Sequence, residues 1–251
     1  MWTWFFKLAS PPHFYALAGR LSMWLLVPAL IFIAVGTFGG LVLAPPDYQQ
    51  GDAFRIIYVH VPSAYLSMMI YVAMAVAGAI GLIWRIKLAH AVAASCAPIG
   101  ASFTFAALVT GAVWGRPMWG TYWEWDPRLT SELILLFLYF GYMGLRSAFE
   151  NLAQADRASA LLAIAGVVNV PIIHFSVIWW ASLHQGPTLS KLETPSISGD
   201  MLWPLLLNIL AFTLFFLGIL AMRVRAEVLE REVQARWVED LLRSPGRVGV
   251  N

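Results

Sequence analysis

Two of the five histidines in the chain, His60 and His184, have the residue type and the setting to bind a metal. His60 stands just before Pro62 at the start of one apolar stretch, and His184 closes another, just before Gly186 and Pro187. A single histidine at a helix end is most often a surface or capping residue. Two histidines at the same end of a bundle of apolar helices favour a ligand role, because neutral imidazole is a common metal ligand in proteins.

A tryptophan-rich segment lies between these histidines and reads WGRPMWGTYWEWDPRLTSE from position 114. Its tryptophans are Trp114, Trp119, Trp123 and Trp125. One or two of them would indicate the aromatic belt of a membrane–water interface, where indole rings concentrate. Four within a dozen residues, interrupted by glycine and proline, predict instead a folded aromatic surface that binds a ligand.

Haem is the ligand that best combines two histidines with a large aromatic surface, since its iron accepts an imidazole on each face. The single cysteine, Cys96, lies in an apolar stretch, so the sequence holds no cysteine-based metal site and no Cys-x-x-Cys-His motif for covalent attachment. No outer cluster of carboxylates completes a zinc site. The sequence therefore predicts haem b, bound without a covalent link.

Charged residues near the tryptophans are candidates for the same site. Asp126 followed by Pro127 predicts a helix start, with Asp126 as the N-cap and Pro127 in the first helical position. Arg55 and Arg128 are candidate partners of the haem propionates, because a guanidinium group binds a carboxylate through two parallel hydrogen bonds. For Arg128, an ion pair with Glu132 or Asp126 is an equally good prediction.

The elements that must position these residues are apolar helices. The chain of 251 residues is 60% hydrophobic and only 12% charged, a composition typical of membrane proteins. Six stretches reach the roughly 20 residues that a helix needs to cross about 30 Å of hydrocarbon. They lie at about 21–44, 61–84, 91–113, 128–146, 160–182 and 202–222. The sequence predicts an all-α polytopic fold with helix kinks at Pro28, Pro98 and Pro171.

The distribution of basic residues predicts the orientation, because lysine and arginine near a span are retained in the cytoplasm. An even number of spans puts both termini on one side. With cytoplasmic termini, twelve basic residues fall in inner segments and four in outer loops. Those four are Arg55, Arg116, Arg128 and Lys191. We therefore expect a transmembrane domain over 1–223 and a charged cytoplasmic tail over 224–251, either a solvated or interfacial helix or a docking segment.

His174 lies within the fifth apolar stretch, well inside the predicted membrane region. An ionisable residue at that depth is a functional candidate. A neutral histidine that is hydrogen-bonded to a neighbouring helix is an equally good interpretation.

The stretch Trp119-Gly120-Thr121-Tyr122-Trp123-Glu124-Trp125-Asp126 matches the W-G-x-x-W-x-W-D signature of the haem-handling proteins of cytochrome c biogenesis. The resemblance extends to the six spans, the flanking histidines and the segments RIIYVHVPSAY and VVNVPIIHFSVIWWASLHQG, and it covers essentially the full chain. Within this family the chain resembles the CcmC type, since the CcmF and CcsA types have more spans than this chain can supply.

This resemblance implies that His60 and His184 are the axial haem ligands and that the tryptophan-rich loop presents haem to the periplasmic chaperone CcmE. It implies a complex with the ATPase CcmA, its membrane partner CcmB and the small protein CcmD in the lipid of the bacterial inner membrane, with the functional face periplasmic. Haem crossing through the protein and haem arriving from the outer leaflet are both consistent with it. A binding and transport role is implied, with no enzymatic activity and no nucleic-acid partner.

Two other classes of function fit parts of the sequence. An electron-transfer b-type cytochrome subunit also pairs histidines in a helical bundle, but it needs them at membrane depth, where only His174 lies. A small-molecule permease needs polar residues along a path through the midplane, and few are present.

Overall fold

The computed structural model of the protein describes residues 10–186 and 197–243. Within them the elements are helices, apart from an isolated bridge between Asp47 and Gly51, so the prediction of an all-α fold is confirmed. The helices are α2 (Pro11–Phe38), α3 (Ile57–Trp84), α4 (Lys87–Trp119), α5 (Pro127–Ser147), α6 (Leu152–Gly166), α7 (Asn169–Trp179), α8 (Gly199–Arg231) and α9 (Arg236–Arg243). A π-helical turn, Gly39–Leu43, continues α2, and a 3-10 turn, Asp52–Ile56, leads into α3.

Six helical segments among the described residues are long and apolar enough to cross a membrane, which confirms the six predicted spans. They are Pro11–Leu43, Asp52–Trp84, Lys87–Trp119, Pro127–Ser147, Leu152–Trp179 and Gly199–Arg231. Large apolar side chains such as Trp24, Leu30 and Phe137 are exposed on the outside of the bundle, as expected where lipid is the solvent. The protein is a multi-pass membrane protein.

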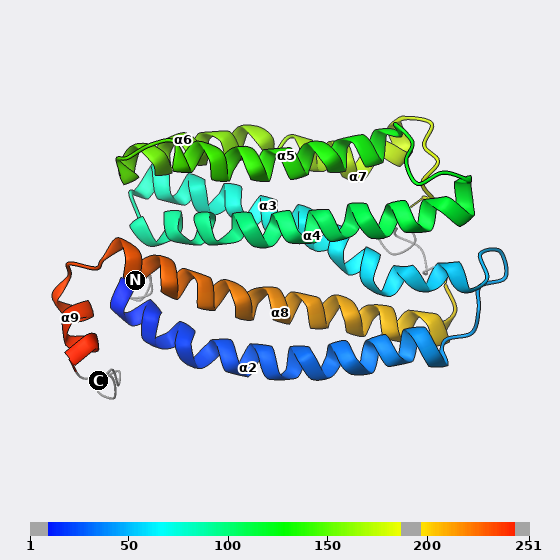
Figure 1. Ribbon diagram of the computed structural model, residues 1–251, viewed down its shortest axis with the longest axis horizontal. Helices are drawn as coiled ribbons and strands as arrows, with labels where there is room; N and C mark the ends of the chain where they lie inside the picture. Colours follow the sequence, from blue (N-terminus) through cyan, green and yellow to red (C-terminus); the bar gives the residue numbers. More distant parts are fainter. Residues whose placement is uncertain (1–9, 187–196, 244–251) are drawn as a thin grey trace.

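Helices α2 to α8 run side by side along the long axis of the molecule (Figure 1). Helix α2 packs along α8, α3 packs along α4, and α5 contacts α4, α6 and α7. The start of α2 and the last helix, α9, lie at one end of the bundle, and the connections that follow α2 and α4 lie at the other end (Figure 1). This second end is the one predicted to face outward, and the cytoplasmic position of the termini stays a prediction.

Several helix ends differ from those predicted. Helix α4 continues to Trp119 instead of ending at 113, so Trp114 and Trp119 are helical residues rather than loop residues. It ends where Gly120 takes a positive φ of 81°, a left-handed conformation that glycine adopts without strain. Helix α2 begins earlier than predicted, at Pro11, and α8 runs on to Arg231.

The fifth span is interrupted. Helix α6 ends at Gly166 and α7 begins at Asn169, because Pro171 has no N–H group to donate to the carbonyl of Val167. Helix α7 then ends at Trp179, before the predicted residue 182. Helices α2 and α4 continue through their own prolines, Pro28 and Pro98.

Two predicted regions are described only in part. The connection between the predicted spans 160–182 and 202–222 includes residues 187–196, so Lys191 lies outside the described residues. The charged tail, predicted over 224–251, is described up to residue 243 and consists of the end of α8 followed by α9.

Replacing Gly100 of α4 with alanine is expected to destabilise the bundle, because the new Cβ would overlap the ring of Tyr139 on α5. Tyr139 is fully buried and its hydroxyl donates to the carbonyl of Ser67 (2.7 Å), so the ring has little freedom to move away. We expect a loss of about 1–3 kcal/mol, measured as a lower midpoint of thermal denaturation in mild detergent. Gly144→Ala is the control, since its Cβ would meet nothing within 4 Å; equal midpoints for the two variants would contradict the expectation.

Candidate functional site

His60 lies in the first turn of α3, at the end of the bundle that is predicted to face outward. Its Nδ1 lies 3.1 Å from the carbonyl of Ala107 and 3.0 Å from the hydroxyl of Thr110, both on α4. The carbonyl can only accept, and the Thr110 hydroxyl already donates to Ala106 (2.6 Å), so Nδ1 must carry the proton. This tautomer leaves the lone pair on Nε2 free for a ligand.

The sequence predicted that His184 closes a helix, and this prediction is wrong. His184 lies beyond the end of α7 in a non-helical stretch, Trp180–Gly186, which we call the His184 segment. Its Nδ1 lies 2.9 Å from the carbonyl of Gln185, so here too Nε2 is free. Burial of the ring, and secondly the nearby guanidinium of Arg128, lower the pKa of His184 to about 4. The imidazole is therefore neutral at neutral pH, the form that binds a metal.

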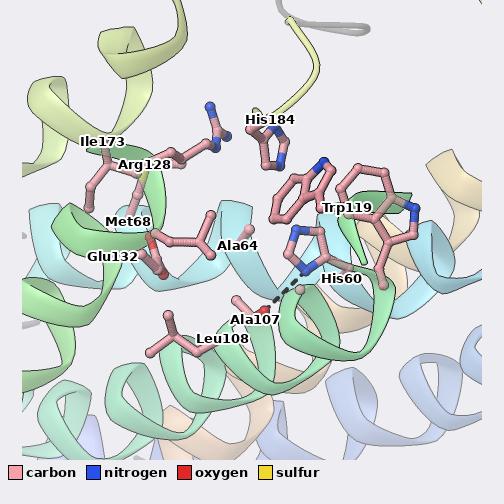
Figure 2. A pocket seen from close by; sticks show the side chains of 13 residues that line it. His60, Ala64, Met68, Ala107, Leu108, Trp119, Arg128, Glu132, Ile173 and His184 are labelled. Carbon is pink, nitrogen blue, oxygen red and sulfur yellow. Dashed lines mark hydrogen bonds between the residues drawn. The ribbon is translucent and has the colours of Figure 1, made fainter. Parts of the chain in front are cut away.

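The two imidazole rings line one cavity, as Figure 2 shows. Their centres are 6.3 Å apart and their planes are inclined by 31°. With metal–nitrogen bonds of about 2 Å, imidazoles on opposite sides of one metal have ring centres roughly 6 Å apart. The distance between the two ring centres therefore matches the one expected when a single iron lies between two imidazoles. The inner wall of the cavity is mostly apolar, formed by Met68, Leu108, Leu129 and Ile173, and the buried carboxyl group of Glu132 also lines it.

The four candidate tryptophans separate into two pairs. Trp114 and Trp119 line the cavity, with ring centres 5.1 Å apart and nearly perpendicular planes, and Trp114 lies 6.1 Å from the ring of His184. Trp123 and Trp125 pack edge to face on the connection between α4 and α5, with ring centres 5.5 Å apart. Trp125 is 75% exposed. The first pair thus forms a wall of the cavity, and the second extends an aromatic surface beyond it.

The two candidate arginines also separate. Arg128, in the first turn of α5, lines the cavity next to His184 (Figure 2). Arg55 does not line it: its guanidinium pairs with Asp52 (2.9 Å) and donates to the carbonyl of Gly40 (2.8 Å). The structure therefore brings only Arg128 together with the two histidines.

Asp126 is the N-cap of α5, as the sequence predicted. Only 6% of its surface is exposed. One carboxylate oxygen accepts from the backbone N–H of Arg128 (2.8 Å). The other accepts from the backbone N–H of Leu183 (2.8 Å), in the His184 segment. Sequence reasoning found the first bond but had no signal for the second, which joins residues that are 57 positions apart.

Gln50 is a residue of the site that the sequence did not indicate. Its side-chain oxygen accepts from the indole N–H of Trp114 (3.0 Å), and its amide nitrogen donates to the side-chain oxygen of Gln185 (3.3 Å). The loop before α3 is thereby connected to both the tryptophan wall and the His184 segment. A glutamine in a turn carries no signature of such a role, so only the spatial arrangement shows it.

Comparison with known proteins identifies the family. The family model described as CcmC, Heme exporter protein C, matches residues 4–239. The chain belongs to this family. A protein named Heme exporter protein C from Haemophilus influenzae is 48% identical over 241 residues, which cover 96% of this chain and 98% of the relative. The protein of the same name from Escherichia coli K12 is 49% identical over 247 residues, covering 98% of this chain and 100% of the relative. A third, from Bradyrhizobium diazoefficiens, is 46% identical over 228 residues, 91% of this chain and 86% of the relative.

The side chains around the cavity do not resemble a site for a bare metal ion. Across residues 10–186 and 197–243, no three or more His, Cys, Asp or Glu side chains gather where they could hold an ion. A haem iron takes only its axial ligands from the protein, so two histidines suffice for it. His174 does not join them: it packs edge to face on Phe175, with ring centres 4.7 Å apart, and it does not line the cavity.

Proposed function

We propose that the protein binds haem b in this cavity without a covalent link, with His60 and His184 as the two axial ligands of the iron. The observation that carries the proposal is the 6.3 Å spacing of two imidazoles that both keep Nε2 free. The relatives' name, Heme exporter protein C, supports the same ligand. The only cysteine, Cys96, is buried in the apolar interior of α4, which agrees with non-covalent binding.

The surrounding residues fix the position of haem. Trp114 and Trp119 present an apolar aromatic wall to one edge of the macrocycle. Arg128 is the cation within reach of a propionate. Arg55 can take the same part only if its guanidinium leaves Asp52 and Gly40.

We propose further that haem is held here in transit, for delivery to the chaperone CcmE in cytochrome c maturation. The exposed rings of Trp125 and Tyr122, which are 75% and 59% accessible, form the surface that the chaperone contacts. In this proposal the site faces the periplasm from the bacterial inner membrane, and the protein works with CcmA, CcmB and CcmD. Its role is handling and transport of haem rather than catalysis.

The visible spectrum of the protein purified in mild detergent tests the proposal. We expect the spectrum of six-coordinate haem with two histidine ligands, and we expect that signal to move to the apo-chaperone CcmE when the two proteins are mixed and separated. A small-molecule permease would be colourless. An electron-transfer cytochrome would keep its haem in the presence of the chaperone, so either result would contradict the proposal.

A further inference from the structure

The His184 segment is the part of the site that has no regular secondary structure of its own. It begins after α7, and the N–H of Trp180 still bonds to Ser176 of that helix (3.1 Å). Beyond this point, two bonds of His184 stay local: its N–H donates to Ser182 (3.1 Å) and its Nδ1 contacts Gln185. Local bonds of this kind shape a turn but do not fix its place relative to His60.

Asp126 supplies a connection to a rigid element. Its carboxylate joins the N–H of Leu183, the residue directly before His184, to the N–H of Arg128 in the first turn of α5. Both bonds are 2.8 Å long, and the carboxylate is buried. Hydrogen bonds to an ionised acceptor are stronger than those between neutral groups, and exclusion of water strengthens them further.

Capping of α5 alone does not require an aspartate here. Asparagine is as good an N-cap as aspartate. An asparagine side chain, however, has one acceptor oxygen and one NH₂ donor, so it can cap α5 but cannot also accept from Leu183. The use of both carboxylate oxygens therefore indicates a task beyond starting the helix.

We propose that Asp126 is a positioning residue for haem ligation: by tying Leu183 to the start of α5, it holds the imidazole of His184 opposite that of His60. This inference rests on the proposed haem site. The bond between Gln50 and Gln185, on the other side of His184, is a weaker second tie, since it is 3.3 Å long and exposed.

Asp126→Asn separates the two tasks of the side chain, because it keeps the cap of α5 and removes the acceptor for Leu183. In the haem-free protein we expect backbone hydrogen exchange across 180–186 to become about tenfold faster. In the haem-loaded protein we expect Asp126→Asn to lose the bis-histidine spectrum to the extent seen in His184→Ala. The variant that combines Asp126→Asn with His184→Ala should show no further loss. Leu183→Pro, which removes the donor instead of the acceptor, should have the same two effects.

Asn151→Ala is the matched control. Asn151 caps α6 by accepting from Ala153 (3.0 Å) and Gln154 (3.2 Å) at the other end of the bundle, so its loss should leave both the exchange at 180–186 and the haem spectrum unchanged. Unchanged exchange in Asp126→Asn and Leu183→Pro would overturn the positioning role. An unchanged spectrum in His184→Ala would instead overturn the haem site, while the exchange result in haem-free protein would still decide whether Asp126 holds the segment.

Discussion

Replacing either His60 or His184 with alanine is expected to abolish the bis-histidine absorption spectrum of haem in the purified protein. Each variant would remove one of the two proposed axial ligands, so the haem iron would be left five-coordinate, with the sixth position open to water or an external base. Loss of a side chain that hydrogen-bonds to a metal ligand typically lowers metal affinity about 10–100-fold. Removal of the ligand itself should therefore lower haem content at least as much. Absorption and electron paramagnetic resonance spectra of equal amounts of folded protein measure the loss.

The appropriate control is His174→Ala, since His174 lies in α7, shortly before the His184 segment, but does not line the cavity. It should keep the wild-type spectrum. Added imidazole should restore six-coordination in His60→Ala or His184→Ala, because a small neutral ligand can occupy the position of the missing ring. If both alanine variants keep an unchanged spectrum, the assignment of the two histidines is wrong.

The fold was largely accessible from the sequence because apolar stretches of membrane length are strong signals. The helix ends were less accessible, since they depend on local backbone features rather than on hydrophobicity. Helix α4 passes the predicted end at 113 and stops only where Gly120 adopts a positive φ. The fifth span divides near Pro171, and α7 ends at Trp179, which leaves His184 outside a helix.

The candidate site was accessible in part. The histidine pair could be chosen by position along the chain, and the cap formed by Asp126 could be read from Asp126-Pro127. Which tryptophans line the cavity could not, because that depends on α4 continuing to Trp119. The bonds from Asp126 to Leu183 and from Gln50 to Gln185 join distant segments, and a single sequence carries no signal for such pairs.

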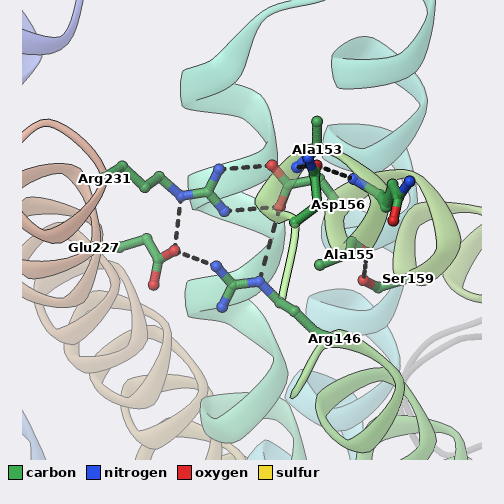
Figure 3. Close-up of polar contacts among 9 residues, drawn as sticks. Arg146, Ala153, Ala155, Asp156, Ser159, Glu227 and Arg231 are labelled. Carbon is green, nitrogen blue, oxygen red and sulfur yellow. Dashed lines mark hydrogen bonds and ion pairs between the residues drawn. The ribbon is translucent and has the colours of Figure 1, made fainter. Parts of the chain in front are cut away.

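At the opposite end of the bundle, replacing Asp156 with alanine is expected to destabilise the protein without changing its haem site. Asp156 on α6 accepts two hydrogen bonds from Arg231 of α8 (2.7 and 2.9 Å) and lies 3.8 Å from Arg146 of α5 (Figure 3). Glu227 completes the group by pairing with both arginines, at 2.5 Å and 2.7 Å. The four charges balance, and each side chain is largely buried, with 9% exposure for Asp156 and Arg231.

Removing one acid from this group leaves two buried guanidinium groups with a single carboxylate. Breaking a buried ion pair in this way typically costs about 3–5 kcal/mol, whereas removing both partners together costs much less. We therefore expect a clearly lower thermal midpoint for Asp156→Ala in mild detergent and a partial recovery in Asp156→Ala combined with Arg231→Met, where Arg146 and Glu227 still form a pair. Arg157→Ala, which removes an exposed neighbouring charge, should change little.

The haem spectrum makes this experiment specific to the ion-pair group. Asp156→Ala protein that remains folded should keep the wild-type spectrum, because α5 carries both Arg146 at one end and Arg128 at the other, and only the first loses its partner. A midpoint equal to that of Arg157→Ala would show that the buried charges do not join α5, α6 and α8. Loss of the spectrum at a temperature where the variant is folded would show instead that the two ends of the bundle are coupled through α5.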